Sequence, residues 1–177
     1  MASAQHIIAR FDHAEYRWCR SLNRAAAVPP ARRLFQVASR LGDGVAWYLL
    51  MAALPLACGP GALRAVLAMA LTGAAGAGIY RWLKGWLVRE RPFIRHAGIE
   101  RAMAPLDRYS FPSGHTLHAV SFTWQACAHY PDLAWVLVPL AALIALSRIV
   151  LGLHYPTDVL AGGVLGALLA AIGLAIS

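Results

Sequence analysis

Long apolar stretches alternate with short polar segments along most of this sequence, and the apolar stretches have the length of membrane-spanning helices. A helix needs roughly 20 mostly apolar residues to cross a hydrocarbon core about 30 Å thick. The pattern predicts five such spans. They run from about Val45 to Cys58, from about Leu63 to Leu83, from just after His115 to near Tyr130, from Leu133 to about Val150, and from Thr157 or Asp158 to the C-terminus.

Small residues within these stretches predict close contacts between helices. Gly73, Gly76 and Gly78 lie among alanines in the second span, and Gly162 and Gly166 have the GxxxG spacing in the fifth. Small side chains let the backbones of membrane helices approach each other. The predicted fold is therefore all-α, an integral membrane bundle of about five transmembrane helices.

The first forty residues have a different pattern. Apolar residues between Ile7 and Leu22 fall loosely at helical spacing, but arginines recur throughout and no window is apolar enough to span. This pattern predicts an amphipathic helix that lies in the membrane interface, with Pro29-Pro30 ending it. We therefore divide the chain into an Arg-rich interfacial segment, residues 1–40, and a transmembrane domain, residues 41–177.

Composition supports a membrane protein and argues against an ordinary soluble domain. Hydrophobic residues make up 59% of the chain and charged residues 14%, and the mean hydropathy is +0.55. The histidines and acidic residues show no HExxH-like arrangement, and the cysteines form no CxxC pair. We therefore expect no metal and no other cofactor.

Three polar clusters at the ends of the spans carry the candidate chemistry. They are Lys84 with Arg91-Pro92, then Pro112-Ser113-Gly114-His115, then Ser147-Arg148 with His154 and Asp158. Antiparallel spans alternate in direction, so the end of the second, the start of the third, the end of the fourth and the start of the fifth share one membrane face. The clusters are therefore predicted to form a single site at that face.

The residue types in these clusters suit a phosphate group. Lysine and arginine side chains, together with free amides at a helix start, can hold a tetrahedral oxyanion. Asp158, in the first turn of the last span, is predicted to hydrogen-bond one ring nitrogen of His154 and leave the other free to attack. His115, at the start of the third span, is placed to donate a proton.

Each element also has a plainer explanation. Basic residues at the end of a span, such as Lys84 and Arg91, are often interfacial anchors, and the turn before His115 can be an ordinary turn. Arg148 is different, because a charge inside an apolar run costs about 2.5–3.5 kcal/mol on insertion scales and usually has a partner or a ligand. The convergence of the clusters therefore favours a site over three separate anchors and turns.

The clusters resemble the three-part signature of the type 2 phosphatidic acid phosphatase family of integral membrane lipid phosphatases, with every signature position filled between Lys84 and Asp158. The resemblance implies that His154 attacks phosphorus to give a phosphohistidine, that Asp158 supports it, and that His115 protonates the leaving oxygen. It also implies that the phosphoryl oxygens are bound without a metal. The implied binding set is Lys84, Arg91, Arg148, Ser113 and the amide of Gly114.

We therefore expect a hydrolase that removes a phosphate or diphosphate group from a lipid. The expected partners are the bilayer and a lipid phosphate rather than nucleic acid, and the oligomeric state stays open. A polyprenyl diphosphate or related polyprenyl phosphate is favoured over phosphatidylglycerol phosphate and phosphatidic acid, and residues 93–110 would separate them. A lipid phosphotransferase, a vanadium-dependent haloperoxidase, whose signature is similar, and a non-catalytic lipid-binding protein are the alternatives.

The distribution of charge predicts an orientation in the membrane. Of the sixteen lysines and arginines, all but Arg64 and Arg148 lie in the first forty residues or between Arg81 and Arg108. Both regions belong to the face that carries the clusters. By the positive-inside rule this face is cytoplasmic, in the inner membrane of a bacterium, although arginines that serve substrate phosphate would weaken the argument.

Overall fold

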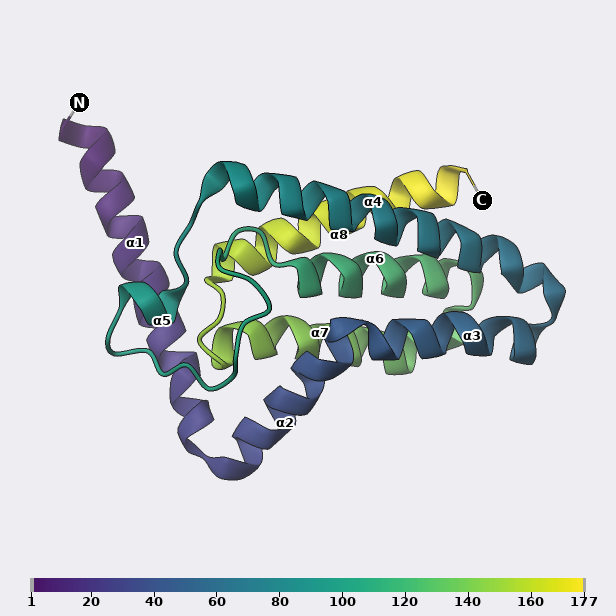
Figure 1. Ribbon diagram of the computed structural model, residues 1–177, viewed down its shortest axis with the longest axis horizontal. Coiled ribbons are helices and arrows are strands. Elements are labelled where there is room, and N and C mark those ends of the chain that lie inside the picture. Colours follow the sequence, from purple (N-terminus) through teal and green to yellow (C-terminus); the bar gives the residue numbers. More distant parts are fainter. Residues whose placement is uncertain (1, 177) are drawn as a thin grey trace.

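The computed structural model describes the backbone of residues 2–176 and the side chains of residues 13–176. Within that range the chain is helical and has no strand, which confirms the all-α fold class. The α-helices are α1 Ala2–Asn23, α2 Pro29–Arg40, α3 Ala46–Cys58, α4 Leu63–Leu87, α5 Pro92–Arg95, α6 Gly114–His129, α7 Ala134–Val150 and α8 Pro156–Ala175. Five of them, α3, α4, α6, α7 and α8, run along the long axis of the molecule, and α1 crosses one end (Figure 1).

These five long-axis helices correspond to the five predicted spans. In the described range, the segments long and apolar enough to cross a membrane are Pro29–Cys58, Pro60–Arg95, Pro131–Val150 and Pro156–Ala175. The central helix α6 is shorter, with 16 residues, and it buries polar side chains such as Ser121 and Gln125. Because α6 packs against α4, α7 and α8, it needs little lipid-facing apolar surface.

Glycines set the distance between α6 and α8. Gly162 lies against the carbonyl oxygen of Ser113, and Gly166 lies against that of Leu117. A β-carbon at either glycine would overlap the backbone of α6. The GxxxG spacing in the last span therefore marks its contact with the central helix, as small residues do in membrane bundles.

The glycines of α4 have two different environments. Gly73 packs on the ring of Phe122, and Gly76 packs on the side chain of Leu117. Gly78, in contrast, has open space where a β-carbon would lie. Two of the three predicted small-residue contacts are therefore formed, and both bring α4 close to α6.

The two prolines at positions 29 and 30 begin a helix. α1 ends at Asn23, a 3-10 turn (η1, Arg24–Ala27) follows, and Pro29 opens α2. The expectation that Pro29-Pro30 ends the amphipathic helix is therefore wrong. The fixed φ and missing amide hydrogen of proline suit the first turn of a helix. α2 then continues through a π-helical turn (η2, Leu41–Val45) into α3.

Helix α1 has one buried face and one exposed face. Glu15 and Asn23 are buried, whereas Trp18 is 66% exposed. Asn23 donates from Nδ2 to the carbonyl oxygens of Glu100 and Val150, both at 2.9 Å. The helix is thus fastened across the end of the bundle by polar contacts, and its placement in the membrane interface stays a prediction.

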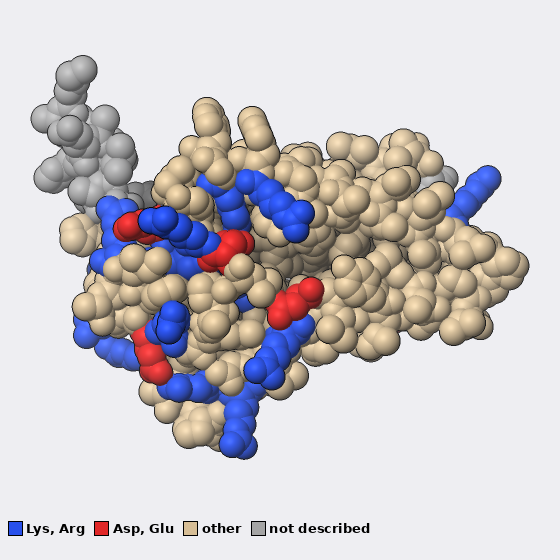
Figure 2. Space-filling view, in the orientation of Figure 1, with Lys and Arg blue, Asp and Glu red and all other residues tan. Residues whose placement is uncertain are grey.

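Charge is concentrated at the end of the molecule that α1 crosses. In Figure 2 the lysine, arginine and acidic side chains gather over α1, α2 and the connection between α4 and α6, while the rest of the visible surface is largely uncharged. Large apolar side chains are exposed along the helices, among them Leu56, Leu160 and Val164. An apolar circumference with a charged end suits helices surrounded by lipid.

Candidate active site

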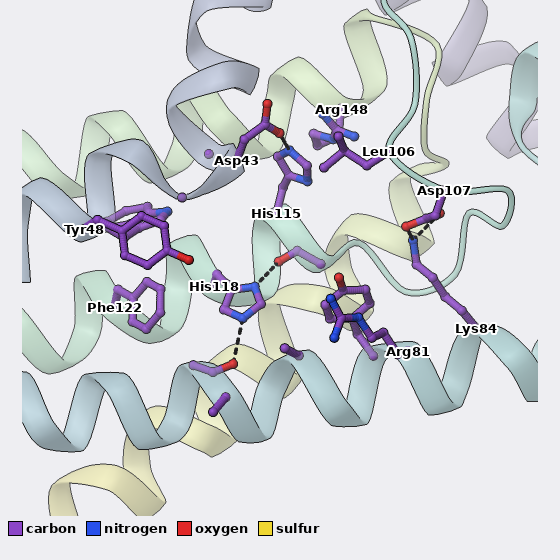
Figure 3. Close-up of a pocket in the computed structure, with 18 of the residues that line it drawn as sticks. Asp43, Tyr48, Arg81, Lys84, Leu106, Asp107, His115, His118, Phe122 and Arg148 are labelled. Carbon is purple, nitrogen blue, oxygen red and sulfur yellow. Dashed lines mark hydrogen bonds and ion pairs between the residues drawn. The ribbon is translucent and has the colours of Figure 1, made fainter.

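One cavity brings the three sequence clusters together. Its volume is about 520 Å³, and Lys84, Arg91, His115, Arg148 and His154 all line it. The five side chains come from the end of α4, the segment after it, the start of α6, the end of α7 and the connection from α7 to α8. In Figure 3, Lys84, His115 and Arg148 approach the same space from different elements.

The end of α4 places two cations one after the other. Helix α4 is one turn longer than the predicted span, and Lys84 lies in this last turn. The helix ends where Val88 adopts a left-handed conformation with φ 43°. Arg91 is extended, with φ −75° and ψ 152°, as a residue before proline prefers. The chain therefore turns back at Val88 and presents Arg91 to the cavity that Lys84 also lines.

A tight connection after α7 places His154 beside Arg148. The amides of Leu153 and His154 both donate to the carbonyl oxygen of Arg148, each at 3.0 Å. Gly152 has φ +75°, which glycine adopts without strain and other residues rarely do. This tight fold-back lets the last turn of α7 and the imidazole share one cavity.

The two ring nitrogens of His154 face different groups. Nε2 lies 3.3 Å from Nη1 of Arg91, and Nδ1 lies 3.6 Å from Oδ2 of Asp158. The second distance is longer than a hydrogen bond. The expected His154–Asp158 hydrogen bond is therefore not formed, and the same carboxylate oxygen accepts the amide of Tyr155 at 2.8 Å.

Asp158 is held by Arg89, which lies outside the three sequence clusters. Nη1 of Arg89 lies 2.7 Å from Oδ1 of Asp158, and Nη2 lies 2.6 Å from Oε2 of Glu15. Glu15 also accepts the amide of Thr157 at 2.9 Å. Because a fully buried carboxylate needs a cation or hydrogen-bond donors, Arg89 stabilises Asp158 behind His154, and α1 completes this network.

Lys84 and Arg91 share one carboxylate. Nζ of Lys84 lies 2.8 and 2.6 Å from the two oxygens of Asp107, and Nη2 of Arg91 lies 2.7 Å from one of them. Burial alone would raise the pKa of Asp107, but the hydrogen bonds and charges of Lys84 and Arg91 hold that pKa below 3.8. Asp107 is therefore an anion at the point where these two cations would meet phosphate oxygens.

One donor of Arg148 has no partner in the part of the chain that the structure describes. The residue is 2% exposed, and its Nη1 donates to the hydroxyl of Ser39. Nε of Arg148 is buried and has no hydrogen-bond partner among the described residues. Leaving a buried donor unsatisfied costs free energy, more for a charged group. An oxyanion in the cavity would satisfy it.

The start of α6 presents His115 and Gly114 to the cavity, but not Ser113. Ser113 is fully buried and is the N-cap of α6, where its Oγ lies 3.0 Å from Oγ1 of Thr116 and accepts the Thr116 amide at 3.5 Å. The structure thus uses the Ser113 hydroxyl to cap the helix. Nε2 of His115 lies 2.5 Å from Oδ1 of Asp43, in η2.

The three clusters and all of these helices fall within, or pack against, one stretch of the chain that matches a known family. Residues 61–177 match the PAP2 superfamily. The chain belongs to this superfamily. With four membrane-length apolar segments in the described range, this PAP2 protein is an integral membrane protein.

Two relatives from Bacillus subtilis (strain 168) and one solved structure illustrate the likeness. The PAP2 chain is 36% identical over 108 residues to phosphatidylglycerophosphatase B, covering 49% of this chain and 45% of that protein. It is 32% identical over 116 residues to undecaprenyl-diphosphatase BcrC, covering 66% and 60%. The chain thus spans about half the length of these curated relatives. The crystal structure of Aquifex aeolicus LpxE is 26% identical, with a TM-score of 0.77, and the match covers 89% of this chain and 92% of that one.

The PAP2 structure adds three residues that the sequence did not identify: Asp43, Arg89 and Asp107. Each makes an ion pair with a predicted site residue. Asp43 could have been identified from its position in the sequence, because it is an acidic residue between two glycines, Gly42 and Gly44, at the start of a predicted span. Asp107 lies within residues 93–110, which were expected to influence substrate choice. Among the described residues, no group of three or more His, Cys, Asp or Glu is arranged to hold a metal ion.

The environment of His154 predicts the pH dependence of the PAP2 site. Burial, and then the charges of Arg148, Arg91 and Lys84, hold the pKa of His154 well below 6.5. A lowered pKa keeps the imidazole neutral, and therefore nucleophilic, as the pH falls through 6.5. We expect the acid limb of kcat/KM for p-nitrophenyl phosphate to lie below pH 6.5 after correction for the second ionisation of the substrate, at about pH 6. An acid limb at or above 6.5 that the substrate does not explain would contradict this expectation.

Removal of the Asp107 carboxylate should strengthen anion binding. Asp107→Asn takes away a negative charge in contact with Lys84 and Arg91, so vanadate, a phosphate mimic, should bind on the order of tenfold more tightly. Titration of vanadate against activity measures this constant. Glu90→Gln removes the same charge from an exposed side chain near the site and should change the constant little. Weaker vanadate binding in Asp107→Asn would mean that Asp107 mainly positions the two cations.

Proposed function

We propose that this PAP2 protein is a metal-independent lipid phosphatase that hydrolyses a lipid phosphate or diphosphate through a phosphohistidine intermediate. The observation that carries the proposal is the division of the cavity into two parts. Lys84, Arg91, Arg148, His115 and His154 line one part, and apolar residues of α3, α4 and α6 line the other; in Figure 3, Phe122 lies away from Arg148 and Lys84. The apolar lining includes Trp47, Met51, Ala70, Ala74 and Phe122. A lipid phosphate has the same two parts, an anionic head and an apolar tail.

In the first step, the phosphoryl group lies among Lys84, Arg91 and Arg148, which neutralise its oxygens. Nε2 of His154, the nitrogen that faces Arg91, attacks phosphorus. The bond from phosphorus to the lipid oxygen breaks, and His115 gives that oxygen a proton. Phosphoryl transfer depends mostly on positioning and charge stabilisation, and three cations in a mostly buried cavity supply both.

In the second step, water replaces the departed lipid group. His115, now neutral, accepts a proton from the water as its oxygen attacks phosphorus, and the bond between phosphorus and Nε2 of His154 breaks. Inorganic phosphate leaves, and both histidines return to their starting protonation states. Asp158 stabilises the positive charge on the His154 ring while the phosphohistidine exists, and Arg89 keeps Asp158 ionised and in place.

We further propose that the preferred substrate is a polyprenyl diphosphate. A diphosphate has more negative charge than a monoester, and this charge helps it to compete with Asp107 for Lys84 and Arg91. The likeness to undecaprenyl-diphosphatase BcrC supports the same choice. Phosphatidylglycerol phosphate is the second candidate, because of the likeness to phosphatidylglycerophosphatase B.

The proposal is tested by phosphate release in detergent. Undecaprenyl diphosphate, undecaprenyl phosphate, phosphatidylglycerol phosphate and phosphatidic acid are supplied separately, each with and without EDTA. We expect release from at least one lipid, the highest kcat/KM for the diphosphate, and no effect of EDTA. Failure to hydrolyse any of the four would refute the phosphatase, and transfer of phosphate to an added lipid alcohol would indicate a phosphotransferase instead.

We also propose that the site opens on the cytoplasmic face of a bacterial inner membrane. The support is the excess of arginine at that end of the bundle. The test places single cysteines at exposed positions of opposite ends, Ala97→Cys near the site and Gly61→Cys far from it, in a chain whose native cysteines are serines. A membrane-impermeant maleimide added to intact cells should label only position 61. Labelling of position 97 alone would place the site outside.

A further inference from the structure

Asp43 reaches His115 from the junction of α2 and α3. Its Oδ1 lies 2.5 Å from Nε2 of His115, and its side chain is 29% exposed, at the cavity that both residues line. We propose that Asp43 is a positioning residue that orients His115 and stabilises its protonated form as the lipid oxygen departs. This inference rests on the proposed phosphatase activity, in which His115 is the proton donor.

The backbone around Asp43 is built to bring this carboxylate to the imidazole. A β-carbon at Gly42 would lie 2.8 Å from Cγ2 of Ile144 and 3.0 Å from Cδ2 of His115, so only glycine lets the turn lie against the ring. Gly44 has φ +128°, a conformation that other residues rarely adopt. Both neighbours of Asp43 are therefore glycines at positions where a side chain would shift the carboxylate away from His115.

The charges around His115 make an acidic partner necessary. Burial of the ring, and then the charges of Arg148 of α7 and Lys84 of α4, disfavour a second proton on His115, and Asp43 is the carboxylate that favours it. His154, on the connection before α8, also faces the same cavity. A carboxylate at Nε2 fixes the hydrogen there and stabilises the imidazolium. Asp43 therefore offsets part of the effect of the cations that the phosphate group needs.

The proton transfer balances on the His115 ring. In the imidazolium form, Nε2–H donates to Asp43 and Nδ1–H faces the substrate. As the bond between phosphorus and the lipid oxygen breaks, the Nδ1 proton moves to that oxygen. The ring is then neutral and still donates from Nε2 to Asp43. Water that attacks the phosphohistidine returns a proton to Nδ1.

The leaving group separates this function from a structural one. An alkyl phosphate releases an alkoxide, which must be protonated, whereas p-nitrophenyl phosphate releases a stable phenolate that needs no acid. The ratio kcat/KM is the suitable measure, because it reports the steps up to departure of the leaving group. If the Asp43 carboxylate only held η2 against α6, its removal would change kcat/KM for both substrates to the same extent.

The experiment compares Asp43→Asn with the wild-type chain in detergent, using dioctanoyl phosphatidic acid and p-nitrophenyl phosphate. We expect kcat/KM to fall by about 100-fold or more for the alkyl phosphate and by less than about fivefold for the aryl phosphate. Vanadate affinity should change little, since the three cations are retained. Asp132→Asn, an exposed residue at the opposite end of the bundle, is the matched control and should retain both activities.

The outcomes distinguish this inference from the proposed function. Equal losses for the two substrates, or no loss for either, would overturn the role of Asp43 while leaving the phosphatase intact. A wild-type chain that hydrolyses neither substrate, and none of the lipid panel, would refute the phosphatase itself. Asp43→Ala is the second variant, and the same selective loss is expected if Asp43→Asn does not yield folded protein.

Discussion

His154→Ala is expected to lower the rate of phosphate release by about 10⁴-fold or more, because it removes the atom that attacks phosphorus. The side chain is 1% exposed, and Nε2 lies among the cations that would hold the phosphoryl group. No other described side chain of the cavity has an imidazole nitrogen in that position. The measurement is phosphate release from the best lipid of the panel. Detection of the phosphohistidine, under conditions that avoid acid, accompanies it.

The matched control for this variant is His129→Ala. His129 is exposed in the last turn of α6, far along the helix from His115, and its loss should leave turnover unchanged. Vanadate should still bind to His154→Ala through Lys84, Arg91 and Arg148, which shows that the cavity is intact. Full turnover in a His154→Ala chain that binds vanadate would refute the phosphohistidine route.

The helices were predictable because the bilayer constrains them so strongly. Without water in the hydrocarbon core, each spanning segment must satisfy its own backbone hydrogen bonds, so apolar length alone locates α3, α4, α7 and α8. Helix α6 was placed by the same apolar pattern, from just after His115 to near Tyr130. The alternation of span directions predicts that Lys84, Arg148 and His154 meet at one end of the bundle, since they lie at the end of the second span, the end of the fourth and the start of the fifth.

The acidic partners of the site could not be predicted in the same way. Asp43, Asp107 and Glu15 lie in a turn, a long connection and a helix outside the bundle, and hydrophobic periodicity does not place such segments in space. The prediction for Pro29-Pro30 failed for a related reason. Proline breaks a helix when it lies in the interior but is favoured in the first turn of a helix. The sequence alone does not tell whether Pro29-Pro30 ends one helix or begins the next.

The contact between His154 and Asp158 illustrates a second limit. The spacing of the two residues predicts a hydrogen bond, but the structure has 3.6 Å between Nδ1 and Oδ2. Asp158 also caps its own helix through the amide of Tyr155 and pairs with Arg89. A carboxylate has several lone pairs, and which donors reach them depends on elements that are distant in sequence. Catalytic hydrogen bonds are also often long before the substrate binds.

Gly162→Ala is expected to impair both stability and activity, because the close approach of α8 to α6 sets the distance between His115 and His154. The added β-carbon would overlap the carbonyl oxygen of Ser113, and backbone cannot rotate away as a side chain can. Overpacking of this kind costs about 3 kcal/mol, which for a chain of this size lowers the melting temperature by roughly 10 °C. Separation of the helices would also move His115 from His154, and a shift near 1 Å costs about 100-fold in rate.

The adjacent residue provides the control. A β-carbon at Gly163 would meet only Cγ2 of Val120, at 4.0 Å, so Gly163→Ala should be neutral or slightly stabilising, since alanine favours helix by about 1 kcal/mol over glycine. Thermal unfolding in detergent and kcat with the best lipid compare the two variants directly. Equal behaviour of Gly162→Ala and Gly163→Ala would show that α8 can shift without moving the histidines, and that the distance between α6 and α8 does not set the geometry of the site.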